Sequence, residues 1–530
     1  MSSKRARENG QLSKESYHAQ EDISAAQPAR FPVASAGVMA ARRVVSGRRL
    51  GHDAKALNTM FAEAVRQELE ANPEADLTSV AMDYLSYADQ LERRFGRRAG
   101  MVLACGNGDC GQLGFGTDEH GCMEEVKIPR LVPNMPQVSM VACGGLHNLA
   151  CTREGHVLSW GSADEGCLGR DGPEATPAEV PGILPRTACQ VAAGDCQSMV
   201  VCTDGAVLGW GTHRDKEGKG WFQAEEGVPA RSAKHAQKTP VVIRGLPAGV
   251  AEVQCGASFN IALDRKGNVY SWGIGEAGEL GRSVCAMKEK VQVRGPTGEM
   301  EEDEEYRFPQ IVETHLTPGH MFWRPTGGGG EARVSGVKTL GCGNYHSLVV
   351  LLEGSRVLVC GLNNYGQLGL GNETSTTTML NVEALEGRGI LSVAGGTHHS
   401  LALGVCGAVF AWGRSDYGQL GVSTGSRGSA GDFINLPKEV NFPSSAGGPT
   451  RVTAVTAGNN HSMAITASRQ LYTWGFGESH ALGLGKDDKD QREPRLVTKG
   501  PAGLQVLAAA GGGQHTIIIG KVPAAGGGGG

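Results

Sequence analysis

The sequence predicts an all-β protein built as a seven-bladed β-propeller, on three observations. Glycine is abundant, at 80 of 530 residues, yet 40% of the residues are apolar. Two short glycine-bounded motifs alternate along the chain, and each occurs seven times. The phase of this alternation also predicts that the propeller is closed by strands from both ends of the domain. The glycines do not recur every third residue, which excludes collagen, and the apolar content excludes a wholly disordered chain.

The first motif is a strand that ends in Trp-Gly or Cys-Gly and is followed, in most copies, by Gly-x-Leu-Gly. Its copies read VLACGNGDCGQLG, VLSWGSADEGCLG, VLGWGTHRDKEGKG, VYSWGIGEAGELG, VLVCGLNNYGQLG, VFAWGRSDYGQLG and LYTWGFGESHALG. The glycine after Trp or Cys stands at 106, 161, 211, 273, 361, 413 and 475. The interval from 273 to 361 is the longest, which indicates an insertion. Runs of Val, Ile, Leu and Trp bounded by glycine predict strands rather than helices.

The second motif supplies the neighbouring strand of each unit. Its copies read VACGGLHNLA, VAAGDCQSMVV, VQCGASFNIAL, LGCGNYHSLVV, VAGGTHHSLAL, VTAGNNHSMAI and AAGGGQHTIII. Turns such as REGH, TDGA and DRKGN predict tight hairpins between the two motifs. A unit of about four strands cannot bury both faces alone, so the units must stack. The array begins with a lone first motif at Met101 and ends with a lone second motif near His515, so we expect one propeller over residues 101–521.

Composition and charge exclude several classes of protein. The net charge is −5 and the isoelectric point is about 6.3, so the whole chain is no polycation. The start, MSSKRARENGQLSKE, lacks the apolar stretch of a secretory signal. The longest apolar runs are too short to cross a bilayer, so no membrane partner is expected. The cysteines form no Cys-x-x-Cys pair, and we interpret them as reduced core thiols of an intracellular protein.

Residues 1–52 are predicted to be a basic disordered tail, because they lack hydrophobic periodicity. Such a tail would be attracted to phosphate and so to DNA, and the alternative is a solvated tail with no partner. The residues assigned to chromatin contact or nuclear import are Lys4, Arg5, Arg7, Arg42, Arg43, Arg48 and Arg49.

Three further segments flank or interrupt the repeats. Residues 53–98 show apolar side chains at three- and four-residue spacing, interrupted by Asn72-Pro73, which predicts a short helical hairpin. This hairpin is expected either to pack on the propeller or to dock a partner. Residues 283–335 form the predicted insertion, with the acidic run GEMEEDEEY and a TGGGG linker. Residues 522–530 are predicted to be a flexible Gly-rich tail.

The histidines and the irregular repeats are the candidate functional residues. Five copies of the second motif carry a histidine three residues after a glycine: His147, His346, His398, His461 and His515. Propeller symmetry would spread these residues around a ring, so we expect no metal site and no cofactor, and imidazoles bonded to loop backbone are the alternative. Asp195 replaces a usual loop residue in the second copy. After Gly211 the chain makes a long charged excursion, HRDKEGKGWFQAEEGVPARSAKHAQKTP, and loops of this length are usually functional or disordered.

These repeats resemble the regulator of chromosome condensation family over about residues 101–520. The segments that carry the resemblance are GDCGQLG, EGCLGRD, GTHRDKEG, GEAGELGR and GGGQHTIII. EGCLGRD and GTHRDKEG are the specific part, because the other repeats lack them. The resemblance implies a nuclear, chromatin-associated guanine-nucleotide exchange factor for the small GTPase Ran, which works without covalent chemistry or a cofactor.

The resemblance also implies which residues contact the GTPase. The long loop would be a β-wedge that inserts against the GTPase near its phosphate-binding loop. The implied GTPase-binding residues are His213, Arg214, Asp215, Lys216, Glu217, Gly218 and Trp221 in the wedge, Asp195, His398, His147 and Arg282 elsewhere, and Asp109, Asn364 and His515 as weaker matches. Ser258 stands where the family has an acidic residue that contributes to exchange. The family's nucleosome-gripping loop corresponds to the insertion 283–335, where acidic residues outnumber basic ones, so nucleosome or DNA contact is expected through the basic tail more than through this loop.

Other functions stay open at the level of sequence. The same propeller serves many unrelated binding roles, so a scaffold without exchange activity is the main alternative. A light sensor similar to the plant ultraviolet photoreceptor is disfavoured, because GGLHN, GNYHS and GNNHS lack the tryptophan of that protein's repeats. No Ser-His-Asp or paired-carboxylate pattern favours a hydrolase.

Overall fold

The computed structural model describes residues 99–118, 121–122, 125–223, 236–284, 288–294, 300–306, 312–325, 330–422, 431–443 and 450–522. The predicted basic tail (1–52) and helical hairpin (53–98) lie outside the described residues, as do the glycines of the C-terminal tail.

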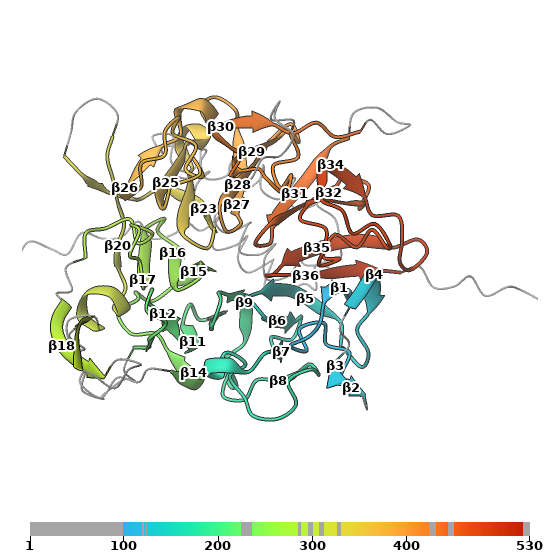
Figure 1. The fold of residues 1–530 in the computed structure, drawn as a ribbon, viewed down its shortest axis with the longest axis horizontal. Coiled ribbons are helices and arrows are strands. Elements are labelled where there is room, and N and C mark those ends of the chain that lie inside the picture. Colours follow the sequence, from blue (N-terminus) through green and yellow to red (C-terminus); the bar gives the residue numbers. More distant parts are fainter. Residues whose placement is uncertain are drawn as a thin grey trace, which may run out of the picture. The chain divides into compact units, whose positions relative to one another are not determined.

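Within these residues the chain forms seven antiparallel blades of a β-propeller, arranged around a centre (Figure 1). Blades 1 to 3 consist of β35 (Gln505–Gly511), β36 (His515–Lys521), β1 (Met101–Asn107) and β4 (Glu125–Leu131); β5 (Val138–Cys143), β6 (His147–Thr152), β7 (Val157–Gly161) and β8 (Ala178–Glu179); and β9 (Ala188–Ala193), β10 (Gln197–Cys202), β11 (Val207–Gly211) and β14 (Gln237–Val242). The fold class predicted from the repeats is therefore confirmed.

The remaining four blades follow in chain order. Blades 4 to 7 consist of β15 (Val250–Cys255), β16 (Phe259–Asp264), β17 (Val269–Gly273) and β20 (Gly319–His320); β23 (Val337–Cys342), β24 (His346–Leu351), β25 (Val357–Gly361) and β26 (Thr376–Asn381); β27 (Ile390–Gly395), β28 (His399–Gly404), β29 (Val409–Arg414) and β30 (Phe433–Glu439); and β31 (Val452–Ala457), β32 (His461–Thr466), β33 (Leu471–Gly475) and β34 (Gln491–Leu496).

Blade 1 takes two strands from each end of the domain. β1 pairs with β36 in a register that runs from Met101↔Gly520 to Gly106↔His515. Figure 1 shows the blue and red ends of the domain side by side in this blade. The first strand of each blade contacts the first strand of the next, and β35 of blade 1 contacts β5 of blade 2. The contacts between blades thus return to their starting point.

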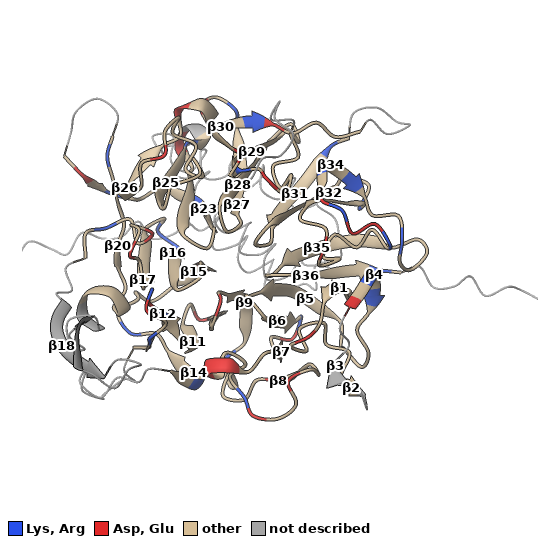
Figure 2. Ribbon diagram, in the orientation of Figure 1, with Lys and Arg blue, Asp and Glu red and all other residues tan. Residues whose placement is uncertain are grey.

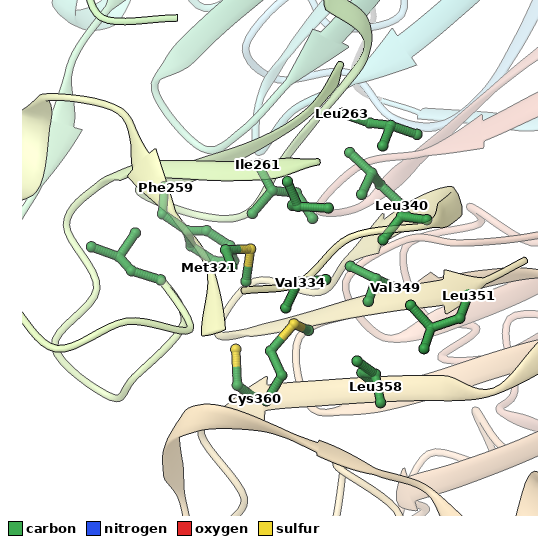
Figure 3. Packing of buried hydrophobic residues seen from close by; sticks show 14 residues of the cluster. Phe259, Ile261, Leu263, Met321, Val334, Leu340, Val349, Leu351, Leu358 and Cys360 are labelled. Atoms are coloured by element: carbon green, nitrogen blue, oxygen red, sulfur yellow. The ribbon is translucent and has the colours of Figure 1, made fainter. Parts of the chain in front are cut away.

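Burial follows the predicted pattern of strands. The second and third strands of the blades are almost completely buried; β6 and β7, for example, contain no exposed residue. Outer strands such as β4 are mostly exposed, with only Val126 and Pro129 of β4 buried, because they lie at the solvent edge of the blade. The apolar clusters lie between adjacent blades. In the cluster between blades 4 and 5, Phe259 and Ile261 of β16 pack with Leu340 and Val349 (Figure 3).

The Gly-x-Leu-Gly turns explain much of the glycine content. The leucines of these turns are buried: Leu113, Leu168, Leu280, Leu368, Leu420 and Leu482. The first glycine of the turn, Gly111 in blade 1, has φ +74°. A Cβ added there would lie 2.7 Å from Cα of Ala175 in the next blade. Glycine is thus required both by the backbone conformation and by the close approach of the neighbouring blade.

The predicted insertion 283–335 is not wholly external to the propeller, which corrects the sequence analysis. β20, the fourth strand of blade 4, lies inside it. The acidic run forms β19 (Met300–Tyr306), which pairs with β18 (Lys288–Arg294) in a hairpin. β21 (Phe322–Trp323) joins the edge of blade 5 through β26. The smaller elements are β2 (Thr117–Asp118), β3 (Gly121–Cys122), β12 (His213–Arg214), β13 (Gly220–Trp221), β22 (Ala332–Arg333), η2 (Asp164–Gly166), η4 (Val312–Leu316), η5 (Glu353–Ser355) and η6 (Glu383–Leu385).

Candidate functional site

One face of the propeller carries the turns between the first and second strands of the blades and the loops that follow the third strands. These segments share a face because the second and third strands are antiparallel, with Gln197 opposite Gly211 in blade 3. Backbone hydrogen bonds link the turns from blade to blade, as from Asp195 N to Ala257 O (3.0 Å) and from Gly513 N to Gly145 O (3.1 Å). We call this side the wedge face.

The long loop after Gly211 forms a small hairpin on this face, residues 212–222, which we call the wedge. β12 pairs with β13 through His213↔Trp221 and Arg214↔Gly220. The turn between them is closed by Gly218 N, which donates to Asp215 O at 2.9 Å. The Asp215 carboxylate accepts hydrogen bonds from Lys219 N and from Trp221 Nε1, each at 2.8 Å. The predicted β-wedge segment therefore forms a compact hairpin held by one carboxylate.

The wedge divides into buried supports and an exposed tip. The side chains of Lys216 and Arg214 are 67% and 43% exposed. Glu217 and Gly218 are also exposed. In contrast, His213, Asp215 and Trp221 are buried. These three residues were predicted as contacts with a partner; their burial corrects this, because their polar groups bond within the protein.

A group of charges surrounds the base of the wedge. Arg214 forms an ion pair with Glu165 of η2, at 3.0 Å. Asp195, half-buried in the first turn of blade 3, lies near the same guanidinium. Burial raises the pKa of the Asp195 carboxyl, and the charge of Arg214 opposes this rise. Figure 2 shows the acidic η2 beside β14. Asp195 and the wedge thus share one face, as the resemblance requires.

His398 belongs to an aromatic group on blades 5 and 6 that the sequence analysis missed. Its ring packs against Tyr345 and Tyr365, with centroid distances of 5.7 and 5.0 Å. Burial, and next the charge of Arg414, lower the pKa of His398 to about 4. Arg414 lies over the rings of Tyr365 and Tyr417, at 5.0 and 5.2 Å. The repeated tyrosine before Gly-Gln-Leu-Gly was the available sequence signal for this group.

Asp109 and Asn364 are exposed on the equivalent loops of blades 1 and 5. Asp109 accepts a hydrogen bond from Asn107 Nδ2 (3.0 Å), and Asn364 accepts one from Gln367 Nε2 (3.2 Å). Both weaker matches are therefore accessible to a partner on the wedge face.

His147 and His515 do not lie on the surface, which corrects their assignment as partner contacts. Both are buried, and each donates from Nε2 to the next blade. Five such bonds, which we call the histidine latches, are His147–Ser198 (2.8 Å), His346–Ser400 (2.7 Å), His399–Ser462 (2.9 Å), His461–Thr516 (3.0 Å) and His515–Asn148 (2.7 Å). The partner is a side chain of the next blade rather than loop backbone. His399, not His398, occupies the repeated position.

Arg282, predicted as a contact with the GTPase, is partly buried and bonded within blade 4. Its Nε donates to Ser271 Oγ (3.2 Å), and its Nη2 donates to the carbonyl oxygens of Ser271 (3.2 Å) and Thr317 (3.1 Å). Arg170 makes the equivalent bonds to Ser159 in blade 2. Both arginines follow Gly-x-Leu-Gly in a blade whose third strand carries serine before Trp-Gly.

Ser258, the residue that replaces the expected acidic group, contacts the wedge. Its Oγ accepts a hydrogen bond from Arg214 N at 3.1 Å. The predicted chromatin residues, Lys4, Arg5, Arg7, Arg42, Arg43, Arg48 and Arg49, lie outside the described residues.

The described part of the chain contains no group of three or more His, Cys, Asp or Glu side chains placed to hold a metal ion. No disulfide bond joins its cysteines. None of its helices is long and apolar enough to span a membrane. A central channel of about 270 Å³ is lined mainly by the first strands of the blades and by their turns.

Comparisons with known proteins agree with this architecture. The human regulator of chromosome condensation is 29% identical over 428 residues, which cover 80% of this chain and 91% of that protein. The guanine nucleotide exchange factor SRM1 of Saccharomyces cerevisiae is 27% identical over 78% of this chain and 86% of that protein. The crystal structure of Prp20p from the same yeast superposes with a TM-score of 0.66 and 27% identity, covering 81% of this chain and 93% of that chain. Residues 101–518 match the RCC1-like domain, and the chain belongs to that family.

Proposed function

We propose that this protein is a guanine-nucleotide exchange factor for a Ran-like small GTPase and that the wedge and its surrounding face bind the GTPase. The observation that carries the proposal is the wedge itself, an exposed Lys216–Gly218 tip on buried supports beside Asp195. The similarity of the chain to yeast SRM1, which is named as a guanine nucleotide exchange factor, supports the activity. The study of Prp20p concerns its binding to Gsp1p and histones, which supports the class of partner.

Exchange by this route involves no covalent step. A GTPase holds its nucleotide through backbone N–H groups, a lysine and Mg²⁺ around the phosphates. A partner that binds the empty GTPase more tightly than the loaded one must weaken nucleotide binding by the same factor. The tip would displace the phosphate-binding region, and the Asp195 carboxylate would pair with basic groups that the phosphates release. Such a factor accelerates release in both directions, so the cellular nucleotide pool sets the product.

The same proposal places the protein in the nucleus, on chromatin. The basic residues of the 1–52 tail would bind DNA or nucleosome phosphate, and the names of the relatives support this location. Binding of the full chain to nucleosomes should then weaken as salt is added, and replacing the seven assigned basic residues by glutamine should reduce that salt dependence. Unchanged binding would remove the tail from the interface.

The central experiment measures release of a fluorescent GDP from purified Ran by the full chain. Wild-type protein should accelerate release, and Asp195→Ala should lower the rate roughly tenfold, as expected when one charge-assisted contact is lost. Asp204→Ala is the matched control, because Asp204 lies on the opposite face in an exposed pair with Arg186. If wild-type protein leaves release at its spontaneous rate, the scaffold interpretation is correct instead.

A further inference from the structure

The junction between blades 3 and 4 lacks a contact that the other junctions have. Elsewhere the carbonyl of the residue before the turn leucine accepts a hydrogen bond from the Trp or Cys of the next blade. These bonds are Trp160–Gln112 (3.1 Å), Trp210–Cys167 (2.7 Å), Cys360–Glu279 (3.6 Å), Trp412–Gln367 (2.8 Å), Trp474–Gln419 (3.0 Å) and Cys105–Ala481 (3.6 Å). In blade 3 the wedge replaces that turn, and the Trp272 indole N–H has no acceptor among the described residues.

The wedge fills this junction with its own side chains. Phe222 is buried and packs in one cluster with Trp272, where the other blades use the leucine of the turn. His213 stacks on Phe222 with a centroid distance of 5.8 Å. Its Nε2 accepts a hydrogen bond from Asn260 Nδ2 at 2.7 Å, so Nδ1 carries the proton that faces Trp221 O at 3.3 Å. Burial lowers the pKa of His213 to about 4, which keeps the ring neutral near pH 7.

Blade 4 also holds the first arm of the wedge. Ser258 Oγ accepts the hydrogen bond of Arg214 N at 3.1 Å. Glu276 Oε2 accepts that of Lys216 N at 3.2 Å. Residues 213, 214 and 216 are therefore each bonded to blade 4, although their place in the sequence assigns them to blade 3.

These bonds contribute to the orientation of the wedge. A ribbon of two paired residues is far too short to be stable alone. Asp215 closes the turn within the wedge, and its carboxylate bonds to Lys219 and Trp221 both stay inside the wedge. Thr212 N donates to Cys196 O of blade 3 at 2.9 Å, so the contacts with blade 4 and the ion pair of Arg214 with Glu165 add to this anchor and help to orient the tip relative to the wedge face.

We propose that Ser258, Asn260 and Glu276 are positioning residues for nucleotide exchange, which hold the wedge from the neighbouring blade before the GTPase arrives. A tip that is already ordered does not lose conformational freedom on binding, so more of the contact energy is available to displace nucleotide. This inference rests on the proposed function. It gives Ser258 a role of its own: its hydroxyl fixes the backbone of the wedge.

The test uses the full chain with a pair of substitutions and a conservative counterpart. Ser258→Ala with Glu276→Ala removes both acceptors, whereas Ser258→Thr with Glu276→Gln keeps them. The alanine pair should lower the maximal rate of GDP release from Ran roughly tenfold while the Ran concentration at half-maximal rate changes less than about threefold. The conservative pair should restore the rate to within about twofold of wild type.

Hydrogen–deuterium exchange of the protein without Ran gives a readout that does not depend on activity. The amides of residues 213–218 should exchange faster in the alanine pair, and not in the conservative pair. Ser462→Ala is the matched control: it breaks a histidine latch between blades 6 and 7 and should lower thermal stability without changing release or the wedge amides.

The results separate the possible explanations. Slower release together with faster exchange confined to the wedge supports the proposal. Unchanged wedge amides, or faster exchange spread over all blades, overturns it and assigns Ser258 and Glu276 to fold stability. If wild-type protein does not accelerate release at all, the proposed function fails, and the positioning role fails with it even when the wedge amides respond.

Discussion

Arg282→Ala is expected to destabilise the propeller without weakening its action on the GTPase. The substitution removes three hydrogen bonds, two to Ser271 and one to Thr317. Burial lowers the pKa of Arg282 to about 10, so the cost of burying its charge offsets part of what these bonds contribute. At a net value of about 1 kcal/mol per bond, the expected loss is about 3 kcal/mol. Because the entropy of unfolding grows with size, this loss lowers the Tm of such a domain by only about 3 °C.

Calorimetry and GDP release measured on the same preparation decide between the two roles of Arg282. The Tm should fall, while the Ran concentration at half-maximal rate stays within about twofold of wild type. Arg170→Ala is the matched control, since Arg170 bonds to Ser159 in blade 2 as Arg282 does to Ser271. The two variants should lose similar stability. A roughly tenfold increase in the half-maximal Ran concentration with an unchanged Tm would refute the reasoning and make Arg282 a contact residue.

Two other predictions follow from buried groups. Asp215→Ala leaves the Trp221 indole N–H without its carboxylate acceptor and should slow GDP release roughly tenfold. Asp215→Asn keeps only one acceptor oxygen, so its release rate should exceed that of Asp215→Ala by less than about threefold. The pKa of His461 is lowered by burial to about 4, so the unfolded chain takes up protons that the folded chain does not, and stability present near pH 7 is lost as the pH falls toward 4. Denaturant unfolding should show a loss of about 1.4 kcal/mol per latch histidine between about pH 8 and pH 5.5. His461→Gln introduces the residue that blade 3 has at the equivalent position, Gln197, and should reduce the loss of stability at low pH by the contribution of one histidine. An unchanged pH dependence would contradict this explanation.

The repeats make the fold readable from the sequence. Each copy of the first motif places glycine after Trp or Cys, where the backbone has a positive φ, as at Gly106 (φ +120°) and Gly475 (φ +106°), so the same physical requirement appears seven times in similar letters. The lone motifs at the two ends likewise anticipated the pairing of β1 with β36. The insertion was less readable, because β20 is only two residues long and carries no repeat signature.

The site was only partly readable. The wedge was recognised because its segment departs from the repeat, and the structure places it beside Asp195. Sequence could not separate exposed from buried positions within it: Lys216 and Asp215 are adjacent and equally polar, but only the carboxylate turns inward to bond Trp221. His147 was misassigned for a similar reason, since a latch and a surface contact both need a polar side chain next to a glycine turn.

The side-chain contacts between blades cannot be predicted from the sequence motifs. Asn260 and His213 are far apart in the chain and belong to different repeats, so no local pattern predicts their hydrogen bond. The group around His398 was missed because its members come from several loops, each with one ordinary tyrosine or arginine.

The most direct test of the account is the affinity of the full chain for Ran in its nucleotide-free and its GDP-bound states, measured at equilibrium. An exchange factor must bind the empty GTPase more tightly, by the factor by which it weakens GDP binding. We expect a preference of at least about a hundredfold, reduced by the Ser258→Ala and Glu276→Ala pair. Equal affinity for the two states would contradict the account, because a protein that does not distinguish them cannot drive nucleotide release.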